Sequence, residues 1–500
     1  MTIHSTIETF LSEDTRSFLA KPMRMLIGGD WLDAQTGDTF ATHDPATGAL
    51  IAEVAHAGEA DVDRAAQAAQ GALSGDWSRM APAEREAILR RFADLIEART
   101  DLIGQVEALD SGKPAENIKF VDVPLAVGAL RYNAGFPSKI QGDTVPVNAP
   151  DMHVYTRREP IGVVGAIVPW NFPICQACFK LAPALAAGCT VILKPAEQTP
   201  LSALILGELA GEAGFPPGVI NVLPGHGDTT GQAIVDHPGI HKIAFTGSEA
   251  VGKLIAARGA HHLKHVSLEL GGKNPNIIFA DSDIETAAAT AAMAIFFYSG
   301  QVCTAGSRLL VEDTVYDQVA EIVQAEAAKI SIGHGLNPQT TMGPLVSADQ
   351  LERVSGYVDA ARSEGVKITY GGERCTDSLA DGHFLEPTVL SDVPDGSRAA
   401  REEIFGPVLA MQRFSDSDEL VRRANATHYG LAAGIWTRDL AKAHRTAAAL
   451  QAGTVWVNTY NQFDAAAPFG GYKASGYGRD NGMAGIDKYL QSKAVWVNYG

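Results

Sequence analysis

Residues 161–173, IGVVGAIVPWNFP, decide the fold class of this chain. Residues 161–168 are apolar or glycine and rich in β-branched side chains, which predicts a strand buried on both faces. A helical pattern follows over residues 175–187 and ends at Gly188, a residue type that commonly terminates helices. A buried strand that leads into a helix of this length indicates a parallel sheet built from strand–helix–strand units.

The same alternation of strands and helices extends outward along the chain. In the first half, helices are expected at 62–73, 83–98, 201–214, 230–236 and 249–257, and strands at 191–193, 219–223 and 242–245. In the second half, strands are expected at 277–279, 308–311, 408–414, 431–436 and 453–458, and helices at 284–297, 317–330, 351–361 and 441–450. This pattern predicts two α/β blocks with a boundary near Gly271–Gly272.

Three segments lie outside this alternation. Residues 155–158 and 494–498 are short β-type runs, and strands at a sheet edge often pair with another chain. The first twenty residues are expected to form a loosely held extension. They are acidic and lack the basic and apolar regions of a secretory signal.

Composition narrows the class of protein further. The chain has 500 residues, 46% of them apolar, so it can build several hydrophobic cores and is not a disordered protein. A formal net charge of −18 disfavours nucleic-acid binding. Five cysteines are too few for a disulfide framework, and the longest apolar runs are too short to span a bilayer. We therefore expect a cytoplasmic protein that binds neither nucleic acid nor membrane.

Two residues are candidates for covalent and acid–base chemistry. Cys303 lies in SGQVCT (299–304), on the loop expected between a helix and a strand, where a thiol could act as a nucleophile. The alternative is a packed core thiol. Glu269 lies between two leucines in LELGG (268–272), and burial there would raise its pKa toward that of a general base. The alternative is a glutamate paired with a nearby cation.

Polar side chains also follow the expected strands, at the end of a parallel sheet where ligands bind. The amide of Asn171 in PWNFP (169–173) could donate a hydrogen bond to an oxyanion, or Asn171 could be an ordinary turn residue. Lys194 and Glu197 could hold ribose hydroxyls, or could form a surface ion pair. A carboxylate on the 2′-hydroxyl disfavours a 2′-phosphate, which favours NAD over NADP.

The segment FTGSEAVG (245–252) is expected to run from a strand through a glycine turn into a helix. The N-terminus of a helix attracts phosphate groups. The segment lacks the glycine fingerprint of dinucleotide-binding folds, so it could also be an ordinary turn in which serine caps the helix.

Two further clusters are interpreted as having no metal. Cys175 and Cys178 lie on an apolar helical face without a second pair, so we expect buried thiols rather than a redox or zinc site. The cluster of His261, His262 and His265 is expected to be solvated or to cap a helix.

Seven motifs occur in one order along the chain. They are PWNFP (169–173), KPAEQTP (194–200), FTGS (245–248), LELGGKNP (268–275), GQVCTAGSR (300–308), EEIFGPV (402–408) and PFGGYKASGYGRD (468–480). Together they resemble the aldehyde dehydrogenase superfamily, from about Arg24 to the C-terminus. With RFADLIE (91–97) and LQAGTVWVN (450–458), the chain is most similar to bacterial phenylacetaldehyde dehydrogenases.

The resemblance implies an α/β aldehyde-dehydrogenase fold of three domains. Residues 1–145 and 167–271 would form a Rossmann-like NAD-binding domain, and residues 272–484 an α/β catalytic domain. Residues 146–166 and 485–500 would form a small β oligomerisation domain, in a homodimer or a homotetramer.

The resemblance also implies roles for individual residues. Cys303 would be the nucleophile and Glu269 the base, with the Asn171 amide and the Cys303 N–H group as the oxyanion hole. Lys180 and the acid at Asp480, a position where the family often has glutamate, would assist proton exit. The NAD contacts would be Ile167, Pro169, Trp170, Lys194, Glu197, Gly227, Gly231, Phe245, Gly247, Ser248, Leu270, Glu403 and Phe405.

The implied aldehyde tunnel has an uncharged and mostly aromatic wall. Its residues would be Phe172, Gln176, Phe179, Phe297, Phe463 and Phe469. This wall favours an aromatic or arylalkyl aldehyde such as phenylacetaldehyde, with aliphatic aldehydes second. A cage for the quaternary ammonium group of betaine aldehyde would add tryptophan or an acid. The alternative of a CoA-acylating enzyme is disfavoured by Glu269, because such enzymes usually lack that base.

Overall fold

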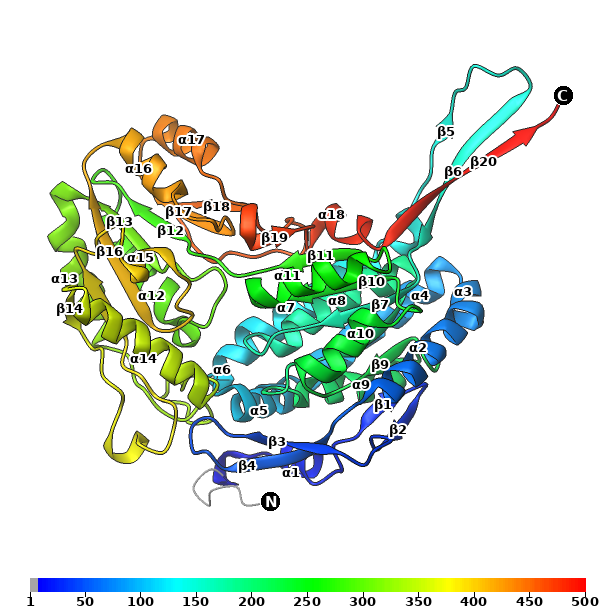
Figure 1. The fold of residues 1–500 in the computed structure, drawn as a ribbon, viewed down its shortest axis with the longest axis horizontal. Helices are drawn as coiled ribbons and strands as arrows, with labels where there is room; N and C mark the ends of the chain where they lie inside the picture. The colour runs from blue at the N-terminus through cyan, green and yellow to red at the C-terminus, as the bar shows by residue number, and fades with distance from the viewer. Residues whose placement is uncertain (1–7) are drawn as a thin grey trace.

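The computed structural model describes residues 8–500 and consists of two lobes and a projecting arm (Figure 1). The first lobe is built on an eight-stranded sheet in the order β19-β11-β10-β7-β8-β9-β1-β2. These strands are β1 (Met25–Ile27), β2 (Asp30–Leu32), β7 (Val163–Ile167), β8 (Thr190–Lys194), β9 (Ile220–Val222), β10 (Lys242–Thr246), β11 (His265–Glu269) and β19 (Gly476–Tyr477). Strands β7 to β11 run parallel, which confirms the predicted α/β fold.

Helices cover this sheet, and residues 161–173 lie near its centre. Every residue of β7 is buried, as is every residue of the following helix α8 (Pro173–Ala187). Gly188 ends α8 in the left-handed conformation, with φ of 93°. The other helices of this lobe are α2 (Glu59–Ser74), α3 (Asp76–Arg79), α4 (Pro82–Ala98), α5 (Thr100–Ser111), α6 (Ala115–Asn117), α7 (Val123–Ala134), α9 (Leu201–Ala213), α10 (Gln232–Asp236), α11 (Glu249–Ala260) and α18 (Gly482–Asp487).

The second lobe contains a seven-stranded sheet in the order β14-β15-β16-β13-β12-β17-β18. Its strands are β12 (Pro275–Ile278), β13 (Arg308–Glu312), β14 (Lys367–Tyr370), β15 (Thr388–Ser391), β16 (Val408–Phe414), β17 (Ala432–Trp436) and β18 (Thr454–Val457). Its helices are α12 (Ile284–Phe296), α13 (Tyr316–Ala327), α14 (Ala348–Ser363), α15 (Arg398–Arg401), α16 (Ser417–Asn425) and α17 (Leu440–Ala449). The chain passes from the first sheet to the second between Glu269 and Pro275.

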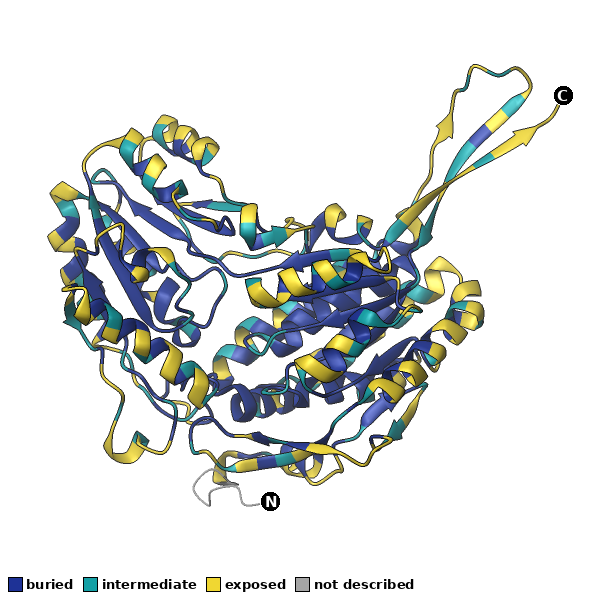
Figure 2. Cartoon of the chain, viewed as in Figure 1, coloured by how far each residue is buried: buried dark blue, intermediate teal, exposed yellow. Residues whose placement is uncertain are grey.

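The arm is a three-stranded sheet of β5 (Thr144–Val145), β6 (Met152–Pro160) and β20 (Leu490–Asn498). The two β-type runs noted in the sequence pair with each other here, from Leu490 opposite Pro160 to Asn498 opposite Met152. The arm extends away from the first lobe, and much of its surface is exposed (Figure 2).

The structure corrects the predicted boundaries of the arm. The arm begins at β5, before residue 146, and residues 163–166 belong to β7 in the first sheet instead of the arm. The reason is that polarity changes near Ile161, where the half-exposed β6 ends and the buried β7 follows. Likewise β19, expected in the catalytic block, pairs with β11 of the first sheet.

The expectation of a loosely held N-terminal extension is wrong for residues 11–20. Helix α1 (Glu13–Leu19) begins at the capping residue Ser12 and buries Phe18 and Leu19 in the core of the first lobe. Residues 1–7 lie outside the described residues. A hairpin of β3 (Thr39–His43) and β4 (Leu50–Ala55) follows. None of the helices within residues 8–500 is both long enough and apolar enough to cross a membrane.

Candidate active site

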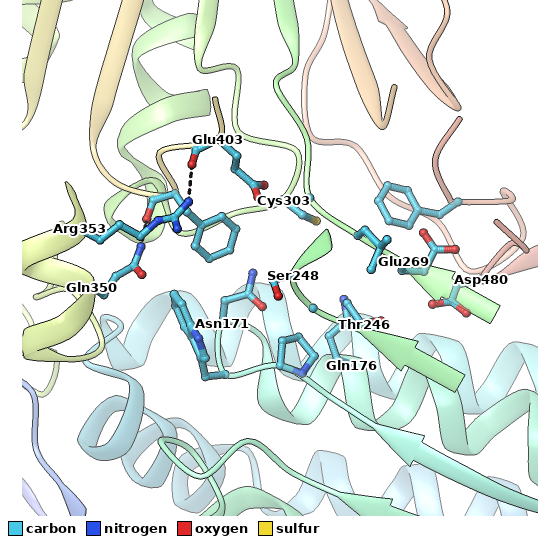
Figure 3. Close-up of a pocket in the computed structure, with 17 residues that line it drawn as sticks. Asn171, Gln176, Thr246, Ser248, Glu269, Cys303, Gln350, Arg353, Glu403 and Asp480 are labelled. Carbon is cyan, nitrogen blue, oxygen red and sulfur yellow. Dashed lines mark hydrogen bonds between the residues drawn. The ribbon is translucent and has the colours of Figure 1, made fainter. Parts of the chain in front are cut away.

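The largest set of predicted residues meets in a cavity between the two lobes (Figure 3). The first lobe contributes the segments that follow the carboxyl ends of β7, β10 and β11. These strands are parallel neighbours, so their ends meet at one edge of the sheet. The predicted residues that line this inner cavity are Pro169, Trp170, Asn171, Gln176, Gly247, Ser248, Glu269, Leu270, Cys303, Glu403, Phe405, Phe469 and Asp480.

Cys303 lies on the loop between the short helix η5 (Phe297–Gly300) and β13, where the sequence placed it. Its side chain is partly exposed and lines the cavity, which argues against a packed core thiol. Burial, followed by the nearby carboxylates of Glu403 and Glu269, raises the pKa of the Cys303 thiol to about 12. The thiol of the free protein therefore holds its proton at neutral pH.

Glu269 ends β11 with its carboxylate buried beside Asp480. Neither carboxylate oxygen of Glu269 has a hydrogen-bond partner within residues 8–500. Burial raises the pKa of Glu269 well above its usual value, and the negative charge of Asp480 adds to this increase. The alternative of a structural ion pair is therefore not what the structure shows.

The Asn171 side chain lies next to the cysteine loop. Its Nδ2 atom donates a hydrogen bond to the carbonyl oxygen of Gln301, at 2.9 Å, two residues before Cys303. A side-chain amide carries two N–H groups, so a second donor is left for an atom bound in the cavity. Because Asn171 also lines this cavity, the geometry favours the oxyanion-donor interpretation over that of a simple turn residue.

Partly exposed acidic and aromatic side chains from both lobes form one wall of the cavity. The Oε1 atom of Glu403 accepts a hydrogen bond from the N–H group of Gly272 at 2.8 Å, and burial raises the pKa of Glu403 to about 7. The rings of Trp170 and Phe405 meet edge to face, with centroids 5.2 Å apart. A methyl group on Gly271 would approach Glu403 Oε2 to 2.1 Å, so only glycine permits this close contact.

The inner cavity fits a ligand with many polar atoms. Three of its residues hold buried oxygens without a partner among the described residues, namely Gln176 Oε1, Thr246 Oγ1 and both oxygens of Glu269. Ser248 caps α11 by accepting a hydrogen bond from the Val251 N–H group. The N-terminus of α11, a helix of 12 residues, favours an anionic group. A dinucleotide with a pyrophosphate is compatible with this donor set.

A second group of predicted cofactor contacts lies outside this cavity. The Nζ atom of Lys194 lies 3.3 Å from Glu197 Oε2, and the lysine is buried whereas the glutamate is partly exposed. A Cβ atom on Gly231 would lie 3.7 Å from the Lys194 side chain, so the segment η4 (Gly227–Gly231) borders this pair. Ile167 and Phe245 are buried in the core of the first lobe and line neither of the two cavities described here.

An outer cavity of about 520 Å³ adjoins the inner one. Two pairs of consecutive residues join them: Asn171 and Cys303 line the inner cavity, and Phe172 and Val302 line the outer one. The predicted tunnel residues Phe172, Phe297 and Phe463 line the outer cavity, whereas Gln176 and Phe469 line the inner one. Phe179 is packed in the core of the first lobe and lines neither cavity.

Sequence reasoning missed several lining residues. Thr246, Gln350 and Arg353 line the inner cavity, and Phe120, Leu125 and Tyr132 line the outer one. Gln350 Nε2 donates to the carbonyl oxygen of Phe405 at 2.7 Å. Thr246 lies within FTGS and could have been found there. The others lie on helical segments whose sequence carries no mark of a site.

The structure shows how far the cysteine pair and the histidine cluster noted in the sequence are buried. Cys175 and Cys178 are buried in α8, which confirms the prediction of buried thiols. His261, His262 and His265 are exposed at and after the end of α11. Within residues 8–500, no group of three or more histidine, cysteine or acidic side chains is placed to hold a metal ion.

Comparisons with known proteins point to one family. The model of the aldehyde dehydrogenase family matches residues 31–495. Human retinal dehydrogenase 2 is 46% identical over 490 residues, covering 97% of this chain and 94% of that protein. An aldehyde dehydrogenase from Bacillus cereus, solved as an NAD+ complex, is 46% identical with a TM-score of 0.96, covering 98% and 99% of the two chains. Indole-3-acetaldehyde dehydrogenase from P. syringae, solved with NAD+ and IAA, is 43% identical with a TM-score of 0.94, covering 97% and 98%.

Proposed function

We propose a reaction mechanism for this chain. The chain belongs to the aldehyde dehydrogenase family and is an NAD-dependent aldehyde dehydrogenase. The observation that carries the proposal is the convergence of Cys303, Glu269 and Asn171 in one cavity between the lobes. A thiol, a carboxylate and an amide donor are the groups that covalent acyl chemistry needs.

Cys303 acts as the nucleophile. Because its thiol is protonated at neutral pH, it loses the proton as the sulfur attacks the aldehyde carbon. Glu269 is the acceptor for that proton, since its carboxylate lies in the same cavity with unpartnered oxygens. A carbon–sulfur bond forms, and the carbonyl oxygen becomes the oxyanion of a thiohemiacetal. The free N–H of Asn171 and the Cys303 backbone N–H donate to that oxyanion.

The residues that hold NAD come from both lobes. Ser248 and the N-terminus of α11 bind the pyrophosphate, and Lys194 and Glu197 bind the adenosine ribose. Glu403 would bind the other ribose, and Trp170 and Phe405 would contact the nicotinamide end of the cofactor. When bound, NAD+ supplies the acceptor for the hydride that leaves the thiohemiacetal carbon, which converts the adduct on Cys303 to a thioester.

Glu269 then activates water for the second half of the reaction. After the Cys303 proton has left by way of Lys180 and Asp480, Glu269 takes a proton from a water molecule as the water oxygen attacks the thioester carbon. The carbon–sulfur bond breaks, the Cys303 sulfur regains a proton, and a carboxylic acid leaves. Lys180 and Asp480, an ion pair at 2.7 Å beside Glu269, assist the exit of the proton.

The substrate is an aromatic or arylalkyl aldehyde such as phenylacetaldehyde. Supporting this, the outer cavity is lined by the rings of Phe120, Tyr132, Phe172, Phe297 and Phe463, and Asp464 is its one acidic lining residue within the described part of the chain. The P. syringae relative is named for indole-3-acetaldehyde, in which one methylene separates an aromatic ring from the carbonyl. A homo-oligomeric assembly is also part of this proposal, with the arm as its contact region.

An aldehyde panel tests the substrate class. Steady-state kcat/KM is measured by NADH formation with phenylacetaldehyde, benzaldehyde, hexanal and betaine aldehyde, with Cys303→Ala as the inactive control. We expect the highest kcat/KM with phenylacetaldehyde. Preference for betaine aldehyde would contradict the assignment of an aromatic substrate to this mostly aromatic tunnel.

Glu269→Gln tests the role of the base. Because glutamine cannot take a proton from water, we expect hydrolysis of the thioester to slow by about 10²- to 10⁴-fold, the usual contribution of a general base. Rapid-quench or stopped-flow NADH traces should then show a burst that is slower than in the wild type, because Glu269 also accepts the Cys303 proton, followed by a still slower steady state. A variant that turns over at the wild-type steady-state rate would refute the assigned role.

A further inference from the structure

The carboxylate of Asp480 is held by two lysines from different segments. Lys180, on α8, donates from Nζ to Asp480 Oδ2 at 2.7 Å. Lys488, which directly follows α18, donates from Nζ to the other oxygen, Oδ1. The side chains of Lys180 and Asp480 are 1% and 2% exposed, and the Lys488 side chain is 10% exposed. Each oxygen of Asp480 therefore has its own cationic partner.

This cluster borders the base of the reaction. Figure 3 shows Asp480 and Glu269 next to each other at one end of the inner cavity. The charged groups that act on Glu269 are Asp480, Lys180, Lys488 and Arg479. Arg479 itself donates to the carbonyl oxygens of Gly471 and Gly478, so its side chain is held by the backbone. Lys242 and Tyr489 are further titratable neighbours of this cluster. The charges of Lys488, Lys180 and Asp480 act on Lys242, and those of Asp480 and Glu269 act on Tyr489.

The charges of the cluster do not cancel. Burial opposes ionisation of Glu269, and among the neighbouring charges only Asp480 adds to this effect, while Lys180 balances the charge of Asp480. Lys488 adds a second positive charge to a pair that would otherwise be neutral. In a buried site a nearby charge changes the ionisation equilibrium of a neighbouring acid substantially.

We propose that Lys488 is a positioning residue for Glu269: with Lys180 it fixes both oxygens of Asp480, and it supplies the positive charge that keeps Glu269 available as a carboxylate. This inference rests on the proposed role of Glu269 as the base. The directions of the pKa shifts agree with it, since Asp480 raises the pKa of Glu269 whereas Lys180 and Lys488 lower it.

The test compares Lys488→Met with Lys329→Met over a range of pH. Lys329 is an exposed lysine paired with Glu326 next to α13, so its removal changes the net charge equally but far from the cluster. Without Lys488, Glu269 should ionise at higher pH. We expect the acidic limb of kcat against pH to move up by about 0.5 to 1 unit, the lower part of the range for a nearby charge. Lys329→Met should leave the limb in place.

Asp480→Asn gives a prediction of opposite sign. Removing the negative charge beside Glu269 should move the acidic limb to lower pH, whereas a variant that merely loosens the structure would not reverse the direction. Lys488→Arg should restore the wild-type limb, because it keeps the charge, and it also serves if Lys488→Met fails to fold.

The outcomes separate the two proposals. A limb unchanged in folded Lys488→Met, together with loss of the limb in Glu269→Gln, would overturn the role of Lys488 alone. A limb that persists in Glu269→Gln would instead overturn the role of Glu269. Movement in opposite directions for Lys488→Met and Asp480→Asn is the result that the cluster predicts.

Discussion

At the scale of single residues, the reactive thiol lies in an unfavourable place for a thiolate. Cys303 has two carboxylates among its neighbours, the buried Glu269 and the partly exposed Glu403, and both raise its pKa. The contribution of Glu403 to the pKa of Cys303 depends on pH, because the pKa of Glu403 is itself raised to about 7. Near neutral pH, the charge on Glu403 therefore changes, and with it the electrostatic cost of ionising Cys303.

Glu403→Gln should make the thiol of the free enzyme more reactive. Removing a negative charge lowers the pKa of Cys303, so the thiolate fraction rises. At pH 8, where Glu403 is mostly ionised, we expect alkylation by iodoacetamide to be about 3- to 10-fold faster than in the wild type, as for a pKa decrease of about half to one unit. At pH 6 the difference should shrink, because Glu403 is then mostly neutral in the wild type.

Two controls accompany this measurement. Glu402→Gln removes the charge of an exposed neighbour that pairs with Arg398, and it should leave the rate unchanged. Cys303→Ala gives the background alkylation of Cys375, the other partly exposed thiol among the described residues. Equal rates for Glu403→Gln and the wild type at pH 8 would rule out this electrostatic coupling.

At the scale of elements, the turn before Cys303 is the unusual segment. Tyr298, Ser299 and Gly300 are consecutive left-handed residues, with φ of 49°, 56° and 68°. Such a run is costly for residues other than glycine and persists where the surroundings hold it. The Tyr298 hydroxyl donates to Asp122 Oδ1 at 2.8 Å, and Ser299 Oγ donates to the Gly343 carbonyl oxygen at 2.7 Å. The turn is therefore held from the buried side by both lobes.

Tyr298→Phe should weaken this support without removing the ring. It leaves Asp122, which is fully buried and also paired with Lys113, without one of its donors. A buried acceptor that loses its donor costs about 1 to 3 kcal/mol, so we expect a lower free energy of unfolding by that amount. Urea denaturation measures this change. Tyr477→Phe, at a tyrosine of β19 that is 49% exposed, is the matched control and should have no effect, and an unchanged midpoint for Tyr298→Phe would contradict the prediction.

At the scale of the whole molecule, the arm projects from the first lobe with much of its surface exposed. Strand β20 lies at the edge of the arm's sheet and has one neighbouring strand, β6. Trp496, Val497 and Tyr499 at its end are 58%, 42% and 70% exposed. An unpaired edge with exposed apolar side chains is a pairing surface, and a second copy of the chain fits the proposed oligomer.

The double variant Trp496→Lys/Val497→Lys should dissociate this assembly. Charged side chains on an edge strand oppose pairing with another chain. Light scattering after size-exclusion chromatography should give a multiple of the chain mass for the wild type and a lower multiple for the variant. Leu440→Lys, at another exposed apolar residue, should keep the wild-type mass. A monomeric wild type would contradict the proposal.

Much of the local structure could be predicted from the sequence. The apolar run at 161–168 and the pattern at 175–187 correspond to β7 and α8, because a buried strand and a buried helix each require a characteristic periodicity. The position of Cys303 on a loop followed in the same way, whereas strand β11, which ends at Glu269, was not predicted. Strands β14 and β15 were missed, since short strands flanked by irregular segments carry little pattern.

What only the tertiary structure decided are the relations between distant segments. Lys180 and Asp480 lie 300 residues apart and form an ion pair, and β20 pairs with β6 although Leu490 and its partner Pro160 are 330 residues apart. The pKa values of Cys303 and Glu269 likewise depend on burial and on charges from other segments. The amino-acid sequence thus determined which chemical groups and local elements exist. Their mutual distances arise from long-range packing, which no local pattern encodes.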